Sequence, residues 1–524
     1  MKRFFTLTFF SLIVLGLNAQ TRYVDEIFTE VAVESDIVYA NNVTVITGMP
    51  VPVDIQLDVY TPVGDTETNR PLIKVFHTGN FLPPLINGQI NGDKTDPYVV
   101  DMIERLVRRG YVVASVNYRL GWNPISPDQD VRTETLINAA YRGVQDSHAA
   151  TRFFRKSVEE GNPYGISGEQ IVNWGVGTGG YLTLGAGTIN EYNDVVLPKF
   201  INANQIPMVL EGVHGDPFGE QMAAINIPNH IGYSNDINLT VNMGGATEIS
   251  WLNDDEPNAT PPKVADGPII SFAVPTDPFA PYGTDFLIVP TTGDIVVEIS
   301  GSYDLQTRAT ELALNTVFTE GTLYDDAWTT SANTNNDGNE GLYPFLRPSW
   351  DLDMDPLTPA AEESAPWDWW DAAFWSTQAP AACGGAPIEL CNWDLLSRRN
   401  NPDASFEKGT TYMDSIINFY APRACVTLDL PCAAMFQDNA VTEILDASVL
   451  TLAPNPASTS VKVTADGKNI KSIAIFGMDG RLYNQITNVN AESATIQRNN
   501  LPTGIYFVKA YFEEGIATQK VTFE

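Results

Sequence analysis

The chain has 524 residues, of which 44% are hydrophobic, and its 64 acidic and 30 basic side chains give a net charge of -34. This length allows one large domain and one or two small ones, because domains usually hold roughly 100 to 200 residues. The strongly negative charge repels nucleic acid and anionic membranes, so the sequence excludes both as partners.

Residues 1–20 predict a secretory signal peptide. A basic start at Met1-Lys-Arg is followed by an apolar run from Phe4 to Leu17 and by the small residue Ala19, which are the three parts of such a signal. We expect cleavage near Ala19 or Gln20. A membrane anchor is the alternative, but the run is shorter than the roughly 20 apolar residues of a spanning helix. With no other candidate segment, we expect a protein that does not span the membrane.

Residues 21–436 predict one α/β domain in which strands and helices alternate. Strands are predicted at 43–46, 53–60, 71–76, 111–118, 171–174 and 268–274, and helices at 96–110, 136–158 and after 177. Such alternation favours a doubly wound, mostly parallel sheet with helices on both faces. From about 301 to 400 the sequence is rich in Asn, Asp, Pro and Trp, and we interpret it as a loop-rich excursion that caps the sheet edge.

The chain closes with a different kind of segment. A helix at 410–420 and a strand at 424–430 are predicted to complete the α/β domain, and 437–450 is predicted to be a linker. From 451 to 524, short strands alternate with Gly, Asn and Asp turns, which predicts a small all-β sandwich. These strands are expected at 459–463, 472–476, 481–483, 494–496, 505–510 and 518–523.

A glycine-rich turn lies between a predicted strand and a predicted helix. The sequence Ile171-Val-Asn-Trp-Gly-Val-Gly177-Thr-Gly-Gly-Tyr-Leu has the local pattern of the Gly-x-Ser-x-Gly nucleophile elbow. Gly177 stands where the nucleophilic serine would be. A side chain at an elbow stores about 1 to 3 kcal/mol of backbone strain, which glycine relieves.

Several blocks together resemble the carboxylesterase and lipase members of the α/β-hydrolase family. In order, they are Leu57-Asp-Val-Tyr-Thr-Pro, His77-Thr-Gly-Asn-Phe, Gly110-Tyr-Val-Val-Ala-Ser-Val-Asn-Tyr-Arg-Leu, Asp146-Ser-His-Ala-Ala-Thr-Arg-Phe, Gly175-Val-Gly-Thr-Gly-Gly and Asp277-Pro-Phe-Ala-Pro-Tyr. The resemblance covers about 43–282, and again Ala421-Pro-Arg-Ala. It implies the fold of that family.

The resemblance also assigns the positions of a catalytic triad. Gly177 occupies the nucleophile position in a degenerate form, and Asp277 retains the acid position. The triad histidine follows the acid along the chain in this family, yet all four histidines precede Asp277. We therefore predict that Ser-His-Asp catalysis is absent, and Asp277 is expected to cap the following turn.

The oxyanion loop is predicted at His77, Thr78, Gly79 and Asn80, with Thr178 supplying the second backbone N–H. Thr78 and Asn80 crowd positions where the family usually has consecutive glycines. We interpret His77 as a buried histidine that fixes this loop rather than as a base.

Two alternatives remain open. The first is an active ester hydrolase with a non-standard nucleophile or a metal-assisted mechanism, in which His214 or His230 is the base. The second is a polysaccharide- or polymer-binding module. In Pro366-Trp-Asp-Trp-Trp-Asp-Ala-Ala-Phe-Trp, helical spacing places Trp367, Trp370 and Phe374 on one face for core packing, whereas Trp369 points elsewhere and offers an indole for stacking.

The cysteines form two close pairs, Cys383 with Cys391 and Cys425 with Cys432. In an exported protein this favours local disulfides, although other pairings and a four-thiolate metal site are alternatives. No cofactor is expected. The loops 333–338 and 351–355 offer oxygen ligands for a structural calcium ion, but a solvated acidic loop is the favoured interpretation.

The C-terminal blocks Leu452-Ala-Pro-Asn-Pro-Ala, Ile473-Ala-Ile-Phe-Gly-Met-Asp-Gly-Arg-Leu and Leu501-Pro-Thr-Gly-Ile-Tyr-Phe-Val resemble the type A sorting domain of bacterial type IX secretion substrates. An ordinary β-sandwich binding module is the alternative. The resemblance implies the type IX machinery as partner and a location outside the cell or on its outer surface. The leading hypothesis is thus an exported, esterase-like pseudoenzyme that binds an unknown small ligand or polymer, or has a structural role.

Overall fold

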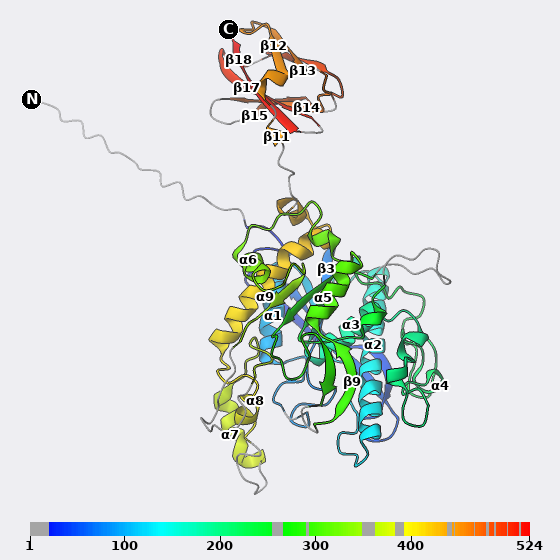
Figure 1. The fold of residues 1–524 in the computed structure, drawn as a ribbon. Coiled ribbons are helices and arrows are strands. Elements are labelled where there is room, and N and C mark those ends of the chain that lie inside the picture. Colours follow the sequence, from blue (N-terminus) through cyan, green and yellow to red (C-terminus); the bar gives the residue numbers. More distant parts are fainter. Residues whose placement is uncertain are drawn as a thin grey trace, which may run out of the picture. The chain divides into compact units, whose positions relative to one another are not determined.

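The structure is a computed structural model that describes residues 20–524 apart from 88, 254–265, 290–292, 348–361, 383–391, 437–442, 445, 466, 478–481, 487–488, 500 and 513–514. The chain divides into two compact units: the first runs to Phe436 except for Gly321–Leu323, and the second consists of Gln437–Glu524 together with Gly321–Leu323 (Figure 1). The predicted signal peptide up to Ala19, Cys383, Cys391 and the loop 351–355 lie outside the described residues. Within the described part, no helix is long and apolar enough to cross a membrane.

The first unit is built on an eight-stranded sheet in the order β1-β2-β4-β3-β5-β6-β7-β10. Its strands are β1 (Val31–Thr44), β2 (Val51–Pro62), β3 (Arg70–Phe76), β4 (Val112–Val116), β5 (Ile166–Val176), β6 (Leu239–Met243), β7 (Ile269–Ala273) and β10 (Leu342–Pro344). The β1–β2 and β2–β4 pairings are antiparallel, and all later pairings are parallel. The predicted α/β fold with a mostly parallel sheet is confirmed.

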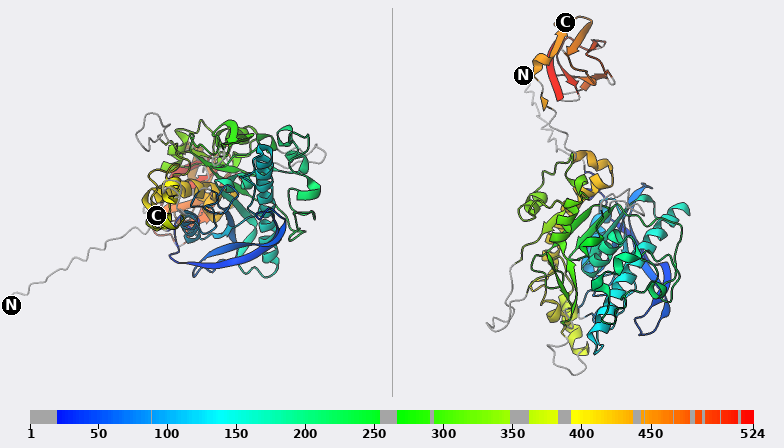
Figure 2. Two further views of the ribbon diagram at one scale, coloured as in Figure 1. Left: turned by 90° about the horizontal axis from the view of Figure 1, so that it is seen from below. Right: turned by 45° about the vertical axis from the view of Figure 1, so that its right-hand side comes forward.

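Helices cover both faces of this sheet (Figures 1 and 2). On one face lie α1 (Pro97–Arg108) and α9 (Phe406–Thr427), and on the other α2 (Gln129–Glu159) and α3 (Thr178–Thr188). The strand β3 contributes side chains to the hydrophobic cores on both faces of the sheet, because successive side chains of a strand point to opposite faces. Ile73 and Val75 join the core with α1 and α9, whereas Leu72 and Phe76 join the core with α2 and α3.

The segment 301–400 contains more regular structure than the sequence predicted. It contributes β10 to the sheet edge and α5 (Ser302–Glu311), whose Leu305 and Ala309 pack with Ile269 of β7. The remaining elements of this unit are α4 (Glu211–His214), β8 (Thr284–Ile288), β9 (Ile295–Ser300), α6 (Ala327–Asn333), α7 (Ala372–Ala382) and α8 (Trp393–Ser397). A strand of three residues, such as β10, carries too few residues to show a period of two.

The predicted strand at 424–430 is wrong, because α9 continues through Pro422 to Thr427. Proline removes one helical N–H and usually ends a helix, which is why the sequence favoured a break. The apolar period continues beyond it, however, since Tyr420, Ala424 and Cys425 are all buried in the core. Tertiary packing of this face therefore outweighs the local preference of proline.

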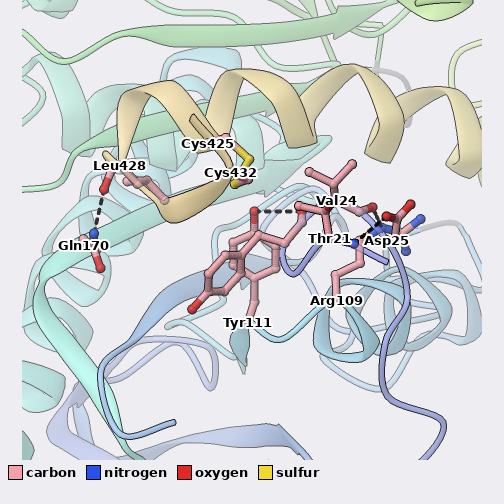
Figure 3. Close-up of a disulfide and its surroundings, with 10 residues drawn as sticks. Thr21, Val24, Asp25, Arg109, Tyr111, Gln170, Cys425, Leu428 and Cys432 are labelled. Carbon is pink, nitrogen blue, oxygen red and sulfur yellow. Dashed lines mark hydrogen bonds between the residues drawn. A yellow bond between two sulfur atoms is a disulfide. The ribbon is translucent and has the colours of Figure 1, made fainter. Parts of the chain in front are cut away.

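Cys425 and Cys432 form a disulfide that joins the end of α9 to the short turn after it (Figure 3). Both cysteines are buried, and between them the Leu428 carbonyl accepts a hydrogen bond from Gln170 Nε2 at 2.6 Å. Local pairing is confirmed for these two cysteines.

Removing this disulfide is expected to lower the free energy of unfolding by about 2–3 kcal/mol, because it closes a short loop and so restricts the unfolded chain only modestly. The double variant Cys425→Ala/Cys432→Ala tests this by urea unfolding without reductant, which leaves any other disulfide intact. An unchanged unfolding midpoint would show that the bridge adds nothing to stability.

The second unit consists of two small sheets, in the orders β11-β18-β17-β14-β15 and β12-β13-β16. Its strands are β11 (Glu443–Ile444), β12 (Leu450–Ala453), β13 (Ser460–Ala465), β14 (Ser472–Gly477), β15 (Leu482–Ile486), β16 (Ser493–Gln497), β17 (Gly504–Tyr511) and β18 (Gly515–Phe523). Apart from the β11–β18 pair, the pairings are antiparallel. The predicted strands are present, and β11 and the start of β12 lie within the predicted linker 437–450.

Candidate functional site

Gly177 forms the sharp turn between β5 and α3. Its backbone angles are φ 53° and ψ -117°, a conformation that residues with a Cβ rarely adopt. Its N–H donates to the Met243 carbonyl at 2.7 Å, and its own carbonyl accepts from the Gly180 N–H at 2.8 Å. The turn thus has the strand, tight bend and helix of a nucleophile elbow, attached to the neighbouring strand β6.

Thr78 fills the space that a side chain at Gly177 would need. A Cβ placed on Gly177 would lie closer than 3.0 Å to both Oγ1 and Cβ of Thr78. Real Cβ atoms essentially never approach other atoms so closely, so two features favour glycine at this position: the positive φ and the contact with Thr78.

Groups of the predicted oxyanion loop are engaged in contacts within the protein. The Asn80 N–H donates to Thr178 Oγ1 at 2.8 Å, which takes one backbone donor away from a substrate. Beside it, His77 is 1% exposed and its ring stacks on Tyr118 with 4.7 Å between centroids. His77 Nδ1 lies 2.6 Å from the Thr78 carbonyl and donates to it, so this side chain fixes the loop.

Asp277 follows β7 and faces the elbow region. Its Oδ1 accepts hydrogen bonds from the backbone N–H groups of Phe279 at 2.8 Å and Ala280 at 3.3 Å. Its Oδ2 lies 3.7 Å from an ideal Cβ on Gly244. Burial raises the pKa of Asp277 to about 8, and the two backbone donors oppose this shift only in part. The carboxyl group caps its turn and has no histidine to orient.

Replacing Asp277 by Asn is expected to stabilise the protein increasingly as the pH rises from about 4 to 8. In the folded protein the pKa of Asp277 lies above the ordinary value of 3.8. The contribution of this carboxyl group to the free energy of unfolding is therefore fully present below pH 3.8 and is lost as the pH rises to about 8. Each pH unit in this window costs up to about 1.4 kcal/mol. Urea unfolding of both proteins at pH 4, 6 and 8 measures the effect; an equal difference at all three values would contradict it.

The structure does not bring the candidate bases to the elbow. His214 Nδ1 accepts from the Leu210 N–H at 2.9 Å, and burial lowers the pKa of His214 to about 4. His230 Nε2 donates to the Tyr39 carbonyl at 2.6 Å. Among the described residues, no hydrogen bond of any of the four histidine side chains goes to a Ser, Thr or Asp side chain.

A cavity of about 190 Å³ lies next to the elbow, with Thr78, Gly177, Thr178 and Asp277 in its wall. Its aromatic lining includes Phe81, Trp122, Tyr181, Trp251, Phe279 and Trp367. The only ionisable side chains other than tyrosine among its lining residues are Asp277 and Asp368, with no Lys, Arg or His. The cavity is therefore large enough for a ring of benzene size, which fits a cavity of about 150 Å³, and its wall is apolar and acidic.

The tryptophan-rich segment supplies part of this cavity, which the sequence did not predict. The helix α7 begins only at Ala372, so Trp367, Trp370 and Phe374 do not share one helical face. Trp367 is 1% exposed and lines the cavity, and Phe374 is 50% exposed. The neighbouring Asp368 also lines the cavity, and neither role follows from residue spacing alone.

Trp369 is not the free indole that polymer binding would need. Its ring packs edge-on against Phe406, with 5.0 Å between centroids. A Cβ on Gly409 would overlap the Trp369 ring, so the indole lies tightly against α9. The Trp369 side chain thus contributes to the packing of the tryptophan-rich segment against α9.

In the loop 333–338, where calcium was the alternative to the favoured solvated loop, two amide oxygens take part in hydrogen bonds within the loop, and Asp337 Oδ2 accepts from the Tyr303 hydroxyl at 3.2 Å. Asn336 Nδ2 donates to Asn333 Oδ1 at 2.9 Å, and Asn336 Oδ1 accepts from the Gly338 N–H at 3.1 Å. Across the described residues, no group of three or more His, Cys, Asp or Glu side chains is arranged to hold a metal ion.

Two family models match the sequence. The model described as BD-FAE, an esterase-like α/β-hydrolase family, matches residues 57–308, and the model described as a secretion system C-terminal sorting domain matches residues 451–524. The curated proteins contain no match.

Similar solved structures include esterases and an acyl hydrolase. A thermophilic esterase from Thermogutta terrifontis, with propionate bound, is 17% identical over 48% of this chain and 74% of its own, with a TM-score of 0.27. A truncated carbohydrate esterase from gut microbiota is 16% identical over 55% and 86%, with a TM-score of 0.30. The tannin acyl hydrolase of Lactobacillus plantarum is 17% identical over 40% and 38%, with a TM-score of 0.24.

Proposed function

Because this chain carries an esterase-like α/β-hydrolase domain of the BD-FAE family and a type IX secretion sorting domain, we propose that its α/β domain binds a small ligand and lacks Ser-His-Asp hydrolysis. The sorting domain directs the protein to the cell surface or the extracellular space and is the part that engages the secretion machinery.

The contact between Gly177 and Thr78 carries this proposal. A lost nucleophile alone is one substitution away from recovery, but here the space for any side chain at the elbow is taken by Thr78. Thr78 does line the cavity. Among the described residues, however, no histidine or carboxylate side chain is hydrogen-bonded to it, so it lacks the base that a nucleophilic hydroxyl needs.

The remaining parts of the machinery support the same conclusion. The Asn80 N–H is engaged with Thr178 Oγ1 at 2.8 Å, and among the described residues none of the four histidine side chains is hydrogen-bonded to Asp277. A triad works only when base, nucleophile and oxyanion donors converge. The cavity beside the elbow is nevertheless retained, and a preformed apolar cavity with a few polar groups is the usual form of a small-molecule site.

Ester hydrolysis by the purified protein tests this proposal. We expect no saturable turnover of p-nitrophenyl acetate, p-nitrophenyl butyrate or methyl esters of aromatic acids. The matched control is Ala140→Phe, which places a ring in the cavity that Ala140 lines. Equal background rates for both proteins support the proposal. Saturable turnover that Ala140→Phe abolishes would overturn it, because such activity would arise in this cavity and not in a contaminant.

A further inference from the structure

The wall of the cavity contains carboxyl groups without cationic partners. Asp277 and Asp368 both line it, and its lining residues include no Lys, Arg or His. Buried charges in proteins are normally paired. Here the wall instead supplies acid groups and aromatic rings, which are the two kinds of side chain that recognise organic cations.

Asp277 and Trp367 face the same small volume. An ideal Cβ on Gly244 would lie 3.7 Å from Asp277 Oδ2 and 3.8 Å from Trp367 Cζ2. The Oδ1 atom of Asp277 is held by two backbone N–H groups, whereas Oδ2 has no hydrogen bond to the described residues. The turn therefore fixes this carboxyl group through Oδ1, and Oδ2 lies near Gly244, which lines the cavity together with Trp367.

Asp368 is a second carboxyl group with a free oxygen. Its Oδ2 accepts a hydrogen bond from Asn91 Nδ2 at 3.3 Å, and its Oδ1 is buried without a hydrogen-bond partner among the described residues. The charge of Lys408 acts on Asp368 and favours its ionised form, but the Lys408 ammonium is itself hydrogen-bonded to Glu363, Asn401 and Asp403. Burial raises the pKa of Asp368 to about 7. The charged form of this carboxyl group would therefore gain from a cationic partner in the cavity.

We propose that the cavity binds an organic cation, a substituted ammonium group carrying an apolar part of about one ring in size, with Asp277 as its counter-ion and Trp367 against it. This inference rests on the proposed ligand-binding function. A cation supplies the partner that both carboxyl groups lack, and the net charge of -34 attracts cations toward the protein. An anionic ligand would meet two acids and no base.

The affinity for such a cation is expected to rise with pH. The bound cation favours the ionised form of Asp277, whose pKa in the empty cavity is about 8, so binding below pH 8 must release a proton. The other titratable side chains in the cavity wall are Asp368, Tyr141 and Tyr181, and burial raises the pKa of both tyrosines above their ordinary range. Affinity should therefore increase up to about tenfold per unit from pH 6 to 8 and level off above it.

Equilibrium dialysis with two probes tests the inference. Benzyltrimethylammonium carries a permanent charge, and neopentylbenzene is its neutral isostere with carbon in place of nitrogen. Because the isostere is the more hydrophobic, an apolar cavity without cation recognition would favour it. At pH 9 we expect the full-length protein to bind the cation at least about tenfold more tightly than the isostere.

Two variants complete the design. Asp277→Asn should weaken cation binding at least about tenfold and leave the isostere unaffected, whereas Glu159→Gln, which removes an exposed charge at the far end of α2, should change neither. Equal or tighter binding of the isostere, an unaffected Asp277→Asn or no cation binding would overturn the inference. Isostere binding alone would leave the proposed ligand-binding function intact, and only cavity-dependent ester turnover would overturn that function.

Discussion

Replacing Gly177 by serine is expected to leave the protein without esterase activity and to lower its free energy of unfolding by about 2–6 kcal/mol. Two costs combine. The positive φ of 53° strains any side chain by about 1–3 kcal/mol, and the overlap with Thr78 forces a local shift that costs about 1–3 kcal/mol more. Urea unfolding and hydrolysis of p-nitrophenyl acetate measure the two outcomes.

Two controls separate the costs. Gly64→Ser has a comparable positive φ of 80° but nothing within 4 Å of its Cβ, so it should show the strain alone. In Gly177→Ser/Thr78→Gly the overlapping atoms are gone, and part of the stability should return without activity. A stable Gly177→Ser protein that hydrolyses esters would show that a base acts at the elbow and that the overlap with Thr78 is not limiting.

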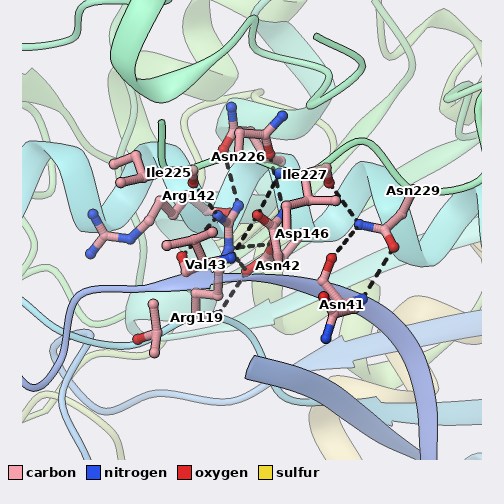
Figure 4. Close-up of polar contacts among 12 residues, drawn as sticks. Asn41, Asn42, Val43, Arg119, Arg142, Asp146, Ile225, Asn226, Ile227 and Asn229 are labelled. Carbon is pink, nitrogen blue, oxygen red and sulfur yellow. Dashed lines mark hydrogen bonds and ion pairs between the residues drawn. The ribbon is translucent and has the colours of Figure 1, made fainter. Parts of the chain in front are cut away.

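Replacing Arg119 by Met is expected to lower the free energy of unfolding by about 3–5 kcal/mol. Arg119 and Asp146 are both 0% exposed and pair with Nε to Oδ1 at 2.8 Å (Figure 4). The guanidinium also donates to the Ile225 carbonyl at 2.9 Å and to Gln145 Oε1 at 3.0 Å. Removing the guanidinium takes away the ion-pair partner of the buried Asp146 and leaves it only the backbone N–H of residue 119 and the charge of Arg142, which is the costly case for a buried ion pair.

The double variant Arg119→Met/Asp146→Leu is the matched control for this prediction. It removes both charges, so its loss of stability should be clearly smaller than the sum of the two single losses. Additive losses would show that the pair does not act as a unit. A loss below about 1 kcal/mol for Arg119→Met would contradict the role of this pair in joining α2 to the segment around Ile225.

The sequence predicted the sheet because buried parallel strands are continuous apolar runs, as at β4 and β5, and such runs are local features. Prediction from the sequence failed for elements whose form depends on tertiary packing. Pro422 lies inside α9 because the apolar face on both sides of it is buried, and β10 is too short to produce a pattern. Neither result follows from a window of neighbouring residues.

The features of the candidate site also fall into those that local sequence predicted and those that depend on the fold. The elbow at Gly177 was predicted because strand, glycine turn and helix follow one another along the chain. The overlap with Thr78 was not, since it depends on how the ends of β3 and β5 approach each other. Trp367 and Asp368 reach the cavity from a segment distant in sequence, so their identity as wall residues required the fold.

Intact-mass measurement after incubation with a fluorophosphonate is the sharpest test for a working nucleophile in the cavity, because this reagent forms a covalent adduct with activated hydroxyl nucleophiles. A serine hydrolase treated in parallel shows that the reagent is active. We expect the full-length protein to keep its unmodified mass. A stoichiometric adduct that Ala140→Phe prevents would contradict it, because a hydroxyl in the cavity would then be a working nucleophile.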